Sequence, residues 1–149
     1  LDRPGALAAL VAGWDSLLAA IRPDFAIADF APALLTAARG RIETATIGTG
    51  FASPPGSMDT FPSWGGMVPA HDAEELLDIA DADLAMSGRT ALPGLPSLFA
   101  ADHQLVMSFT ELDPYADARP PHAYVLPAVR DTSGAPRGGL NAGRMLGER

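Results

Sequence analysis

One stretch, residues 23–51, constrains the fold of this chain more than any other. It reads as a short apolar strand over Asp24–Ala28, a compact helix over Ala31–Arg39 and a β-branched strand over Ile42–Ile47. Two strands joined by so short a helix are expected to lie parallel, with a right-handed crossover between them. The sequence therefore predicts an α/β fold with a Rossmann-like parallel sheet and flanking helices.

The ends of the compact helix carry specific signals. Pro32 suits its first turn, and Gly40 suits the left-handed position that follows its last turn. The preceding strand is short and almost wholly apolar, which is typical of a strand buried on both faces of its sheet. Asp29 follows this strand directly, and so lies at the carboxyl edge, where ligands bind in open α/β sheets.

Further elements flank this unit. A helix is expected to begin at Asp2–Pro4 and to end before Pro23, and its apolar residues recur at helical spacing. A second clear helix is predicted over Asp72–Met86, with Asp72 as its N-cap and most of its acidic residues on a solvated face. Two more strands are predicted, over Gln104–Phe109 and Ala123–Leu126.

Asp29 has three chemical roles open to it. A carboxylate between a strand and a helix can cap the helix amides. It can also orient a histidine and stabilise its protonated form, or act as a base by itself. The sequence leaves these alternatives open.

The loop over residues 48–70 is long for a compact domain, and such loops are usually functional or disordered. It carries four large apolar side chains: Phe51, Phe61, Trp64 and Met67. They either line a pocket over the carboxyl edge or fasten the loop to the domain. Gly48-Thr49-Gly50 lacks the rest of a nucleotide-binding motif, which favours a plain turn at the end of the strand.

Composition excludes several functions. The formal charge of −8 argues against nucleic-acid partners and anionic lipid surfaces. The chain has no cysteine, and its three histidines are widely spaced, so no metal site is predicted. No apolar run is long enough for a membrane span, and no signal peptide is recognisable, so a cytoplasmic setting is expected.

Three segments together resemble the amino-terminal domain of GT-B-fold glycosyltransferases. They are Pro-Asp-Phe-Ala-Ile-Ala-Asp-Phe-Ala-Pro (23–32), Ile-Gly-Thr-Gly-Phe-Ala-Ser-Pro-Pro (47–55) and Phe-Thr-Glu-Leu-Asp-Pro-Tyr (109–115). Tyr-Val-Leu-Pro (124–127) resembles the last strand of that domain. The similarity is to the nucleotide-sugar-dependent glucosyl- and glucuronosyltransferase superfamily, including its bacterial natural-product members.

The resemblance implies hexosyl transfer from a nucleotide sugar to an acceptor hydroxyl. In that family a histidine near the start of the chain deprotonates the acceptor, and an aspartate supports it. Asp29 matches this aspartate, and Phe30, Phe51, Phe61, Trp64 and Met67 become the expected acceptor-binding residues. The histidine has no counterpart here, and the nucleotide sugar, a co-substrate rather than a cofactor, would bind a carboxyl-terminal domain that these residues do not include.

Residues 1–127 are accordingly expected to form part of an acceptor-binding domain, inactive alone, and residues 128–149 a disordered tail. The absence of the family's first strands leaves an edge of the sheet at Asp24–Ala28 bare, which predicts self-association. Alternatives are a non-catalytic binding or assembly module with a truncated Rossmann-like fold, another GT-B enzyme such as a sugar-nucleotide epimerase, and a degraded gene product without a role.

Overall fold

The computed structural model describes residues 3–63 and 70–125. Trp64, Met67 and the tail over residues 128–149 lie outside this part of the chain, as does Asp2. The predictions made for Trp64, Met67 and the tail therefore stay predictions, whereas the expected helix start at Asp2–Pro4 is wrong, because the first helix begins at Ala6 and has Gly5 as its N-cap. Within the described part, three α-helices and three β-strands alternate, followed by short 3-10 turns.

The sheet is parallel throughout, as predicted. Its strands are β1 (Phe25–Ala28), β2 (Glu43–Gly48) and β3 (His103–Val106), in the spatial order β1-β2-β3. Phe25 pairs with Glu43, and Ala45 pairs with His103. The α/β architecture with a Rossmann-like parallel sheet is thus confirmed.

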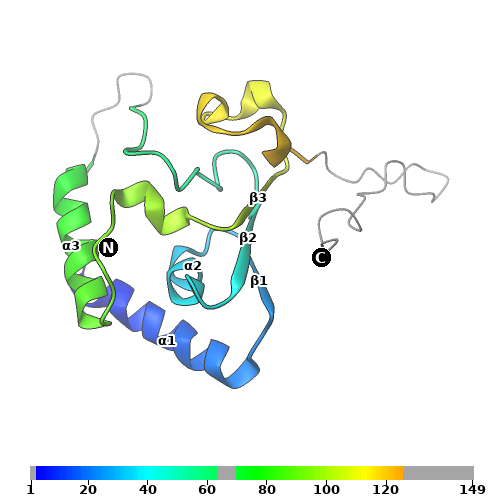
Figure 1. Cartoon of the computed structure of the whole chain (residues 1–149). Coiled ribbons are helices and arrows are strands. Elements are labelled where there is room, and N and C mark those ends of the chain that lie inside the picture. The colour runs from blue at the N-terminus through cyan, green and yellow to red at the C-terminus, as the bar shows by residue number, and fades with distance from the viewer. Residues whose placement is uncertain (1–2, 64–69, 126–149) are drawn as a thin grey trace.

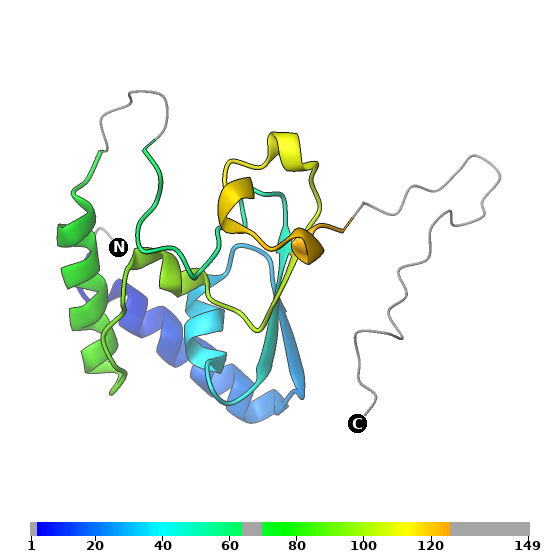
Figure 2. The ribbon, with the colours of Figure 1, turned by 45° about the horizontal axis from the view of Figure 1, so that its top comes forward.

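The helices lie on one side of this sheet (Figures 1 and 2). They are α1 (Ala6–Ile21), α2 (Pro32–Ala38) and α3 (Ala73–Met86). The order β1-β2-β3 means that both crossovers run in the same direction across the sheet. Right-handed connections in one direction place their helices on the same face, which explains the one-sided layer.

The core fills the space between the helices and the sheet. Its buried side chains come from α1, α2, β1, α3 and the 3-10 turn η1 (Leu95–Phe99). Small residues of α2, such as Ala37 and Ala38, are wholly buried, which lets this helix lie close to the sheet. Gly40 has a φ of 72°, the left-handed conformation expected after the helix.

The other face of the sheet is open in the described part of the chain. The register and the alternation of strand side chains place Phe25, Ile27, Ile47, His103 and Leu105 on this open face. Ile27 is 60% exposed, so the prediction of a strand buried on both faces is wrong for β1. The strand sequence shows apolar character but not which face receives a helix layer. β1 also forms one edge of the described sheet.

The apolar stripe of α1 is only partly buried. Leu7, Val11 and Leu18 belong to the core, whereas the exposed fractions of Leu10, Leu17 and Ile21 are 59%, 44% and 63%. The apolar arc of this helix is therefore wider than the surface that α2 and α3 cover.

A side chain of α3 holds the beginning of α1. The N-cap of α1 is Gly5, which has no side chain to cap the helix amides. Asp83, buried on α3, takes this role: it accepts hydrogen bonds from the amides of Gly5, Leu7 and Ala8 at 2.6, 2.8 and 3.3 Å. Most acidic residues of α3 are exposed as expected, and Asp72 caps the helix through the Glu74 amide, but Asp83 is an exception.

The carboxyl-terminal part of the fold is less regular than predicted. The third strand ends at Val106 rather than Phe109, and a single parallel bridge joins Val106 to Tyr124 where a fourth strand was expected. Between them lie the 3-10 turns η2 (Thr110–Leu112), η3 (Ala116–Ala118) and η4 (Pro121–Ala123). These turns lie beyond the carboxyl ends of the strands (Figure 1).

Candidate functional site

Asp29 lies at the carboxyl edge of the sheet with an exposed side chain. The N-cap of α2 is Ala31, and no side chain caps this helix, so the capping role of Asp29 is excluded. Its Oδ1 atom lies 3.6 Å from the position of a Cβ built on Gly48, which directs the carboxylate toward the end of β2. No hydrogen bond or ion pair joins it to a described residue. Asp29 is therefore an uncommitted carboxylate at the edge where ligands bind such sheets.

Phe30, the next residue, has an unusual backbone. Its φ is 45°, in the left-handed region that bulky side chains rarely adopt. Such residues cost free energy and tend to cluster at functional sites. This turn places the Phe30 ring against Phe99 of η1, with ring centroids 5.5 Å apart. The Phe61 ring lies edge-on to the Phe99 ring, with centroids 6.1 Å apart. Three aromatic rings from separate segments thus come together.

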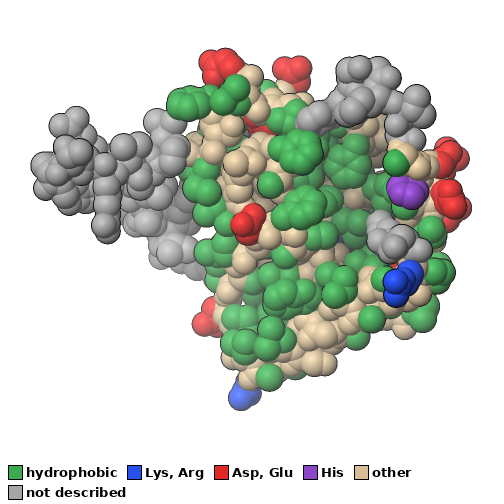
Figure 3. All heavy atoms as spheres, turned by 180° about the vertical axis from the view of Figure 1, so that it is seen from behind, with side chains coloured by type: hydrophobic (Ala, Val, Ile, Leu, Met, Phe, Trp, Pro, Cys, Tyr) green, Lys and Arg blue, Asp and Glu red, His purple; other side chains and the backbone are tan. Residues whose placement is uncertain are grey.

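The three rings border an apolar groove of about 470 Å³, which we call the aromatic groove. It lies between α1, the start of α2, α3 and η1. Its other walls include Leu10, Trp14 and Leu98, and every lining residue is apolar. Figure 3 shows a face on which hydrophobic side chains gather over a wide central area, with most acidic groups near its margins. The groove fits the size range of small-molecule sites, about 300–1,000 Å³.

The structure brings together some of the predicted acceptor-binding residues. Phe30 and Phe61 line the aromatic groove. Phe51 does not line it and is 63% exposed on the loop after β2. Trp64 and Met67 belong to the undescribed segment 64–69. The Asp29 carboxylate is not part of the groove wall either, so the groove and the carboxylate are neighbours linked through the Asp29–Phe30 peptide.

None of the three histidines contacts Asp29. His103 lies at the start of β3, where its Nε2 atom is 2.8 Å from Glu43 Oε1 on the open face. His71 precedes α3 and His122 lies in η4, and both side chains are exposed. A histidine that works with Asp29 would have to come from outside the described residues.

A buried ion pair supports the carboxyl edge. The Asp113 and Arg119 side chains are both 0% exposed and are joined by a 2.5 Å contact between Asp113 Oδ2 and Arg119 Nε. Arg119 also donates from Nη2 to the carbonyl oxygens of Gly50 and Ser53, at 2.8 and 2.5 Å. The pair therefore fastens the turns after β3 to the loop after β2.

Two further contacts complete this network. Tyr124 donates its hydroxyl to Asp113 Oδ2 at 2.8 Å. Burial raises the pKa of the Tyr124 hydroxyl, and its hydrogen bond to Asp113 raises that pKa further. A Cβ added to Gly50 would lie 2.3 Å from Asp113 Oδ1, so the turn at Gly48-Thr49-Gly50 requires glycine for close packing. The sequence favoured a plain turn at this place, and the close contact with Asp113 explains why Gly50 is a glycine.

Sequence reasoning missed the ion pair and Phe99. Arg119 binds carbonyls 69 and 66 positions earlier in the chain, and no local pattern signals such contacts. Phe99 lies at the end of η1, a segment in which the sequence indicated no functional residue.

Two other features of the described residues bear on function. They contain no group of three or more His, Asp or Glu side chains placed to hold a metal ion. Among them, too, no helix has the length and apolar character needed to cross a membrane.

Comparisons with known proteins found no relative: no protein-family model, no curated protein and no solved structure matches this chain.

Proposed function

We propose that this chain is part of the acceptor-binding domain of a nucleotide-sugar-dependent glycosyltransferase of the GT-B type, inactive without a donor-binding domain. The observation that carries the proposal is the exposed carboxylate of Asp29 at the carboxyl edge of the sheet. This carboxylate caps no helix, and the next residue, Phe30, lines an apolar groove. The resemblance of residues 23–32, 47–55 and 109–115 to that family supports it. A cytoplasmic setting belongs to the same proposal.

The chemistry assigned to Asp29 is indirect. A histidine from outside the described residues removes the proton from the acceptor hydroxyl, and Asp29 orients this histidine and stabilises its charged form. The resulting oxyanion attacks C1 of the donor sugar. The bond between C1 and the phosphate oxygen breaks, and the nucleoside diphosphate leaves with its electron pair. Asp29 is thus a positioning residue for a base that this part of the chain does not supply.

The aromatic groove is the proposed acceptor site. Its walls carry no charged group, so it would favour an acceptor with a large apolar or aromatic body. The rings of Phe30, Phe61 and Phe99 present faces and edges on which a planar aglycone can stack. Phe61, one of the aromatic loop residues expected to bind the acceptor, lines this groove, which supports the proposal.

Acceptor binding can be tested on this chain without any donor domain. Trp14 lines the groove, and the chain has one other tryptophan. In a Trp64→Phe background, the fluorescence of Trp14 should change on titration with a planar phenol such as a flavonol. Phe61→Ala should weaken binding about tenfold, whereas Phe109→Ala, which removes an exposed ring outside the groove, should leave it unchanged. Equal effects of both variants, or no binding, would count against the proposed acceptor site.

A second candidate function is a non-catalytic assembly module. It is favoured by the open face of the sheet, because parallel sheets are normally covered on both faces. The two candidates differ at Asp29. The glycosyltransferase proposal predicts that Asp29→Asn lowers transfer by the complete protein without lowering its melting temperature, whereas an assembly module has no activity to lose.

A further inference from the structure

The direction of the Asp29 carboxylate depends on packing, because no hydrogen bond joins it to a described residue. The residues that it packs against belong to the end of β2 and to the segment that follows, residues 49–53, which we call the β2 loop. A Cβ built on Gly48 would lie 3.6 Å from Asp29 Oδ1, 3.7 Å from Ala52 Cβ and 3.9 Å from Ser53 Cβ. The carboxylate and the β2 loop therefore meet at Gly48, and the loop is one wall of the place that the carboxylate occupies.

Arg119 fixes the β2 loop to the rest of the fold. Its Nη2 atom donates to the carbonyl oxygens of Gly50 and Ser53, at 2.8 and 2.5 Å. Its Nε atom donates to Asp113 Oδ2, and its Nη1 atom donates to Gln104 Oε1 of β3 at 3.2 Å. Because a guanidinium is planar and rigid, these contacts fix the two loop carbonyls relative to β3. Figure 2 shows the loop and the turns after β3 together beyond the carboxyl ends of the strands.

Burial indicates that this ion pair does more than stabilise the fold. The side chains of Asp113 and Arg119 are both 0% exposed. Removing two charges from water costs free energy that offsets their attraction, and an apolar pair of similar volume is often as stable. An apolar pair cannot, however, hold two carbonyl groups at set positions, as the guanidinium fork does.

The β2 loop affects the candidate site on the side of Asp29 and not on the side of the acceptor. None of its residues lines the aromatic groove. A change in the loop should therefore alter the direction of the Asp29 carboxylate while the proposed acceptor site stays as it is.

We propose that Arg119 is a second positioning residue of the candidate site. Through the β2 loop it sets the direction of the Asp29 carboxylate, and so the place of the histidine that Asp29 orients. The effect on sugar transfer rests on the proposed glycosyltransferase function, whereas the structural coupling between Arg119 and Asp29 does not.

The coupling can be measured on the full chain without any activity. The readout is the ¹³C chemical shift of the Asp29 carboxyl carbon, assigned through its loss in Asp29→Asn. Arg119→Lys keeps a positive charge beside Asp113 but loses the fork, since an ammonium group is a single point of charge. This variant should move the Asp29 signal. Asp83→Asn is the matched control: it weakens hydrogen bonds between α3 and the start of α1, away from the carboxyl edge, and should leave the signal unchanged.

The consequence for transfer is measured on the complete native protein. Arg119→Lys should lower kcat about 10- to 10²-fold, because a displacement of about 1 Å can cost 10²-fold, and should change the acceptor KM less than about twofold. In an Asp29→Asn background, Arg119→Lys should cause no further fall, since both variants remove the same action. Asp83→Asn should leave kcat unchanged.

Two results would overturn the proposal. One is an Asp29 signal that stays in place in Arg119→Lys, whatever the activity of the complete protein. The other is a pair of rate losses that multiply in the double variant, because Arg119 would then act apart from Asp29. If the complete protein transfers no sugar, the proposed function fails, and the chemical shift alone decides the coupling.

A second variant covers the case in which Arg119→Lys does not fold. Arg119→Met combined with Asp113→Leu replaces the ion pair by an apolar pair, which removes the fork without leaving a buried charge. The Asp29 signal should move in this double variant too. A signal that keeps its wild-type position would show that the fork does not set the direction of the carboxylate.

Discussion

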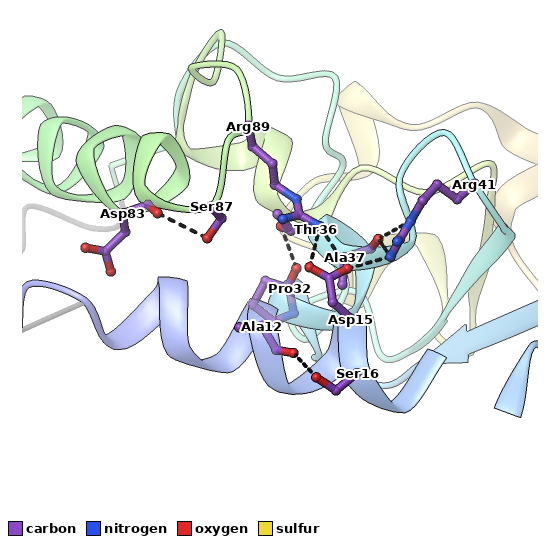
Figure 4. A network of polar contacts seen from close by, with 10 residues as sticks. All are labelled: Ala12, Asp15, Ser16, Pro32, Thr36, Ala37, Arg41, Asp83, Ser87 and Arg89. Atoms are coloured by element: carbon purple, nitrogen blue, oxygen red, sulfur yellow. Dashed lines mark hydrogen bonds and ion pairs between the residues drawn. The ribbon is translucent and has the colours of Figure 1, made fainter. Parts of the chain in front are cut away.

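The buried carboxylate of Asp83 offers the sharpest test of how this fold is held together. Because the N-cap residue Gly5 has no side chain, Asp83 caps α1 from α3 instead, and it accepts hydrogen bonds from three amides of α1 and its N-cap. Figure 4 shows Asp83 on α3, above α1. Asp83→Ala leaves these amides without their acceptor, and an unsatisfied buried group costs about 1–3 kcal/mol. Because two of the three amides are only partly buried, we expect a loss of about 3 kcal/mol.

Asp83→Asn should cost less, about 2 kcal/mol. It keeps an oxygen that can accept one amide but loses the charge that strengthens all three bonds. The assay is urea unfolding, with circular dichroism as the readout. Asp78→Asn is the matched control, since Asp78 is exposed on the same helix, and it should change the free energy of unfolding by less than about 0.5 kcal/mol.

The pH dependence of the free energy of unfolding gives a second, independent test of the role of Asp83. Burial raises the pKa of the Asp83 carboxyl, but the hydrogen bonds from Gly5, Ala8 and Leu7 together outweigh it and hold the pKa below its ordinary value. A depressed folded-state pKa means that the stabilisation is complete above the unfolded pKa, about 3.9, and disappears as the pH falls through the folded pKa. The difference between the wild type and Asp83→Asn should therefore be constant near neutral pH and shrink below about pH 4. A difference that persists unchanged in acid, or equal effects of the Asp83 and Asp78 variants, would refute this reasoning.

Three other predictions concern the network at the carboxyl edge. Gly50→Ala should lower stability by about 1–3 kcal/mol in urea unfolding, because the new Cβ would lie 2.3 Å from Asp113 Oδ1; an unchanged midpoint would contradict this close packing. Arg119→Met leaves Asp113 buried without its partner and should cost about 3–5 kcal/mol, and the double variant with Asp113→Leu should recover part of that loss. Tyr124→Phe should cost about 1 kcal/mol in thermal unfolding through the lost hydrogen bond to Asp113, and no change would mean that water replaces this bond.

Local signals made the β1-α2-β2 unit predictable. Pro32 and Gly40 mark the two ends of α2, and each acts through its own backbone conformation, so no distant partner is needed. The cap of α3 at Asp72 was predictable for the same reason, because its partner is only two residues away. The parallel pairing then followed from the helical connection between the two strands.

Other features depend on distant partners and could not be read locally. In the sequence, Asp83 is one acidic residue among several on α3. The amides that donate to it lie 75 to 78 positions earlier in the chain, so no local pattern distinguishes it. The exposure of Ile27 depends on which face the crossover helices cover, and the strand sequence carries no information on this. The arc of α1 that includes Leu10 and Ile21 looks like core in sequence, but the surface that meets this helix is narrower than the arc.

The candidate site was predictable in part. The position of Asp29 after a strand gave its place at the carboxyl edge, and its free carboxylate emerged only once Ala31 proved to be the N-cap. Phe30 and Phe61 were expected to bind the acceptor together and do line one groove, whereas Phe51 lies apart from it. The third ring, Phe99, comes from η1, far along the chain from Phe30 and Phe61, and the packing of η1 against α2 and α3 brings it there.

The most direct test of the central proposal is a transfer assay on the complete native protein. The protein would be incubated with a planar phenolic acceptor and a set of nucleotide sugars, and the mass of the acceptor would then be measured by mass spectrometry. The proposal predicts that the acceptor gains one hexosyl group and that Asp29→Asn lowers the rate by about 10²–10⁴ without lowering the melting temperature. Absence of the product with every nucleotide sugar, or an Asp29→Asn rate equal to that of the wild type, would contradict it.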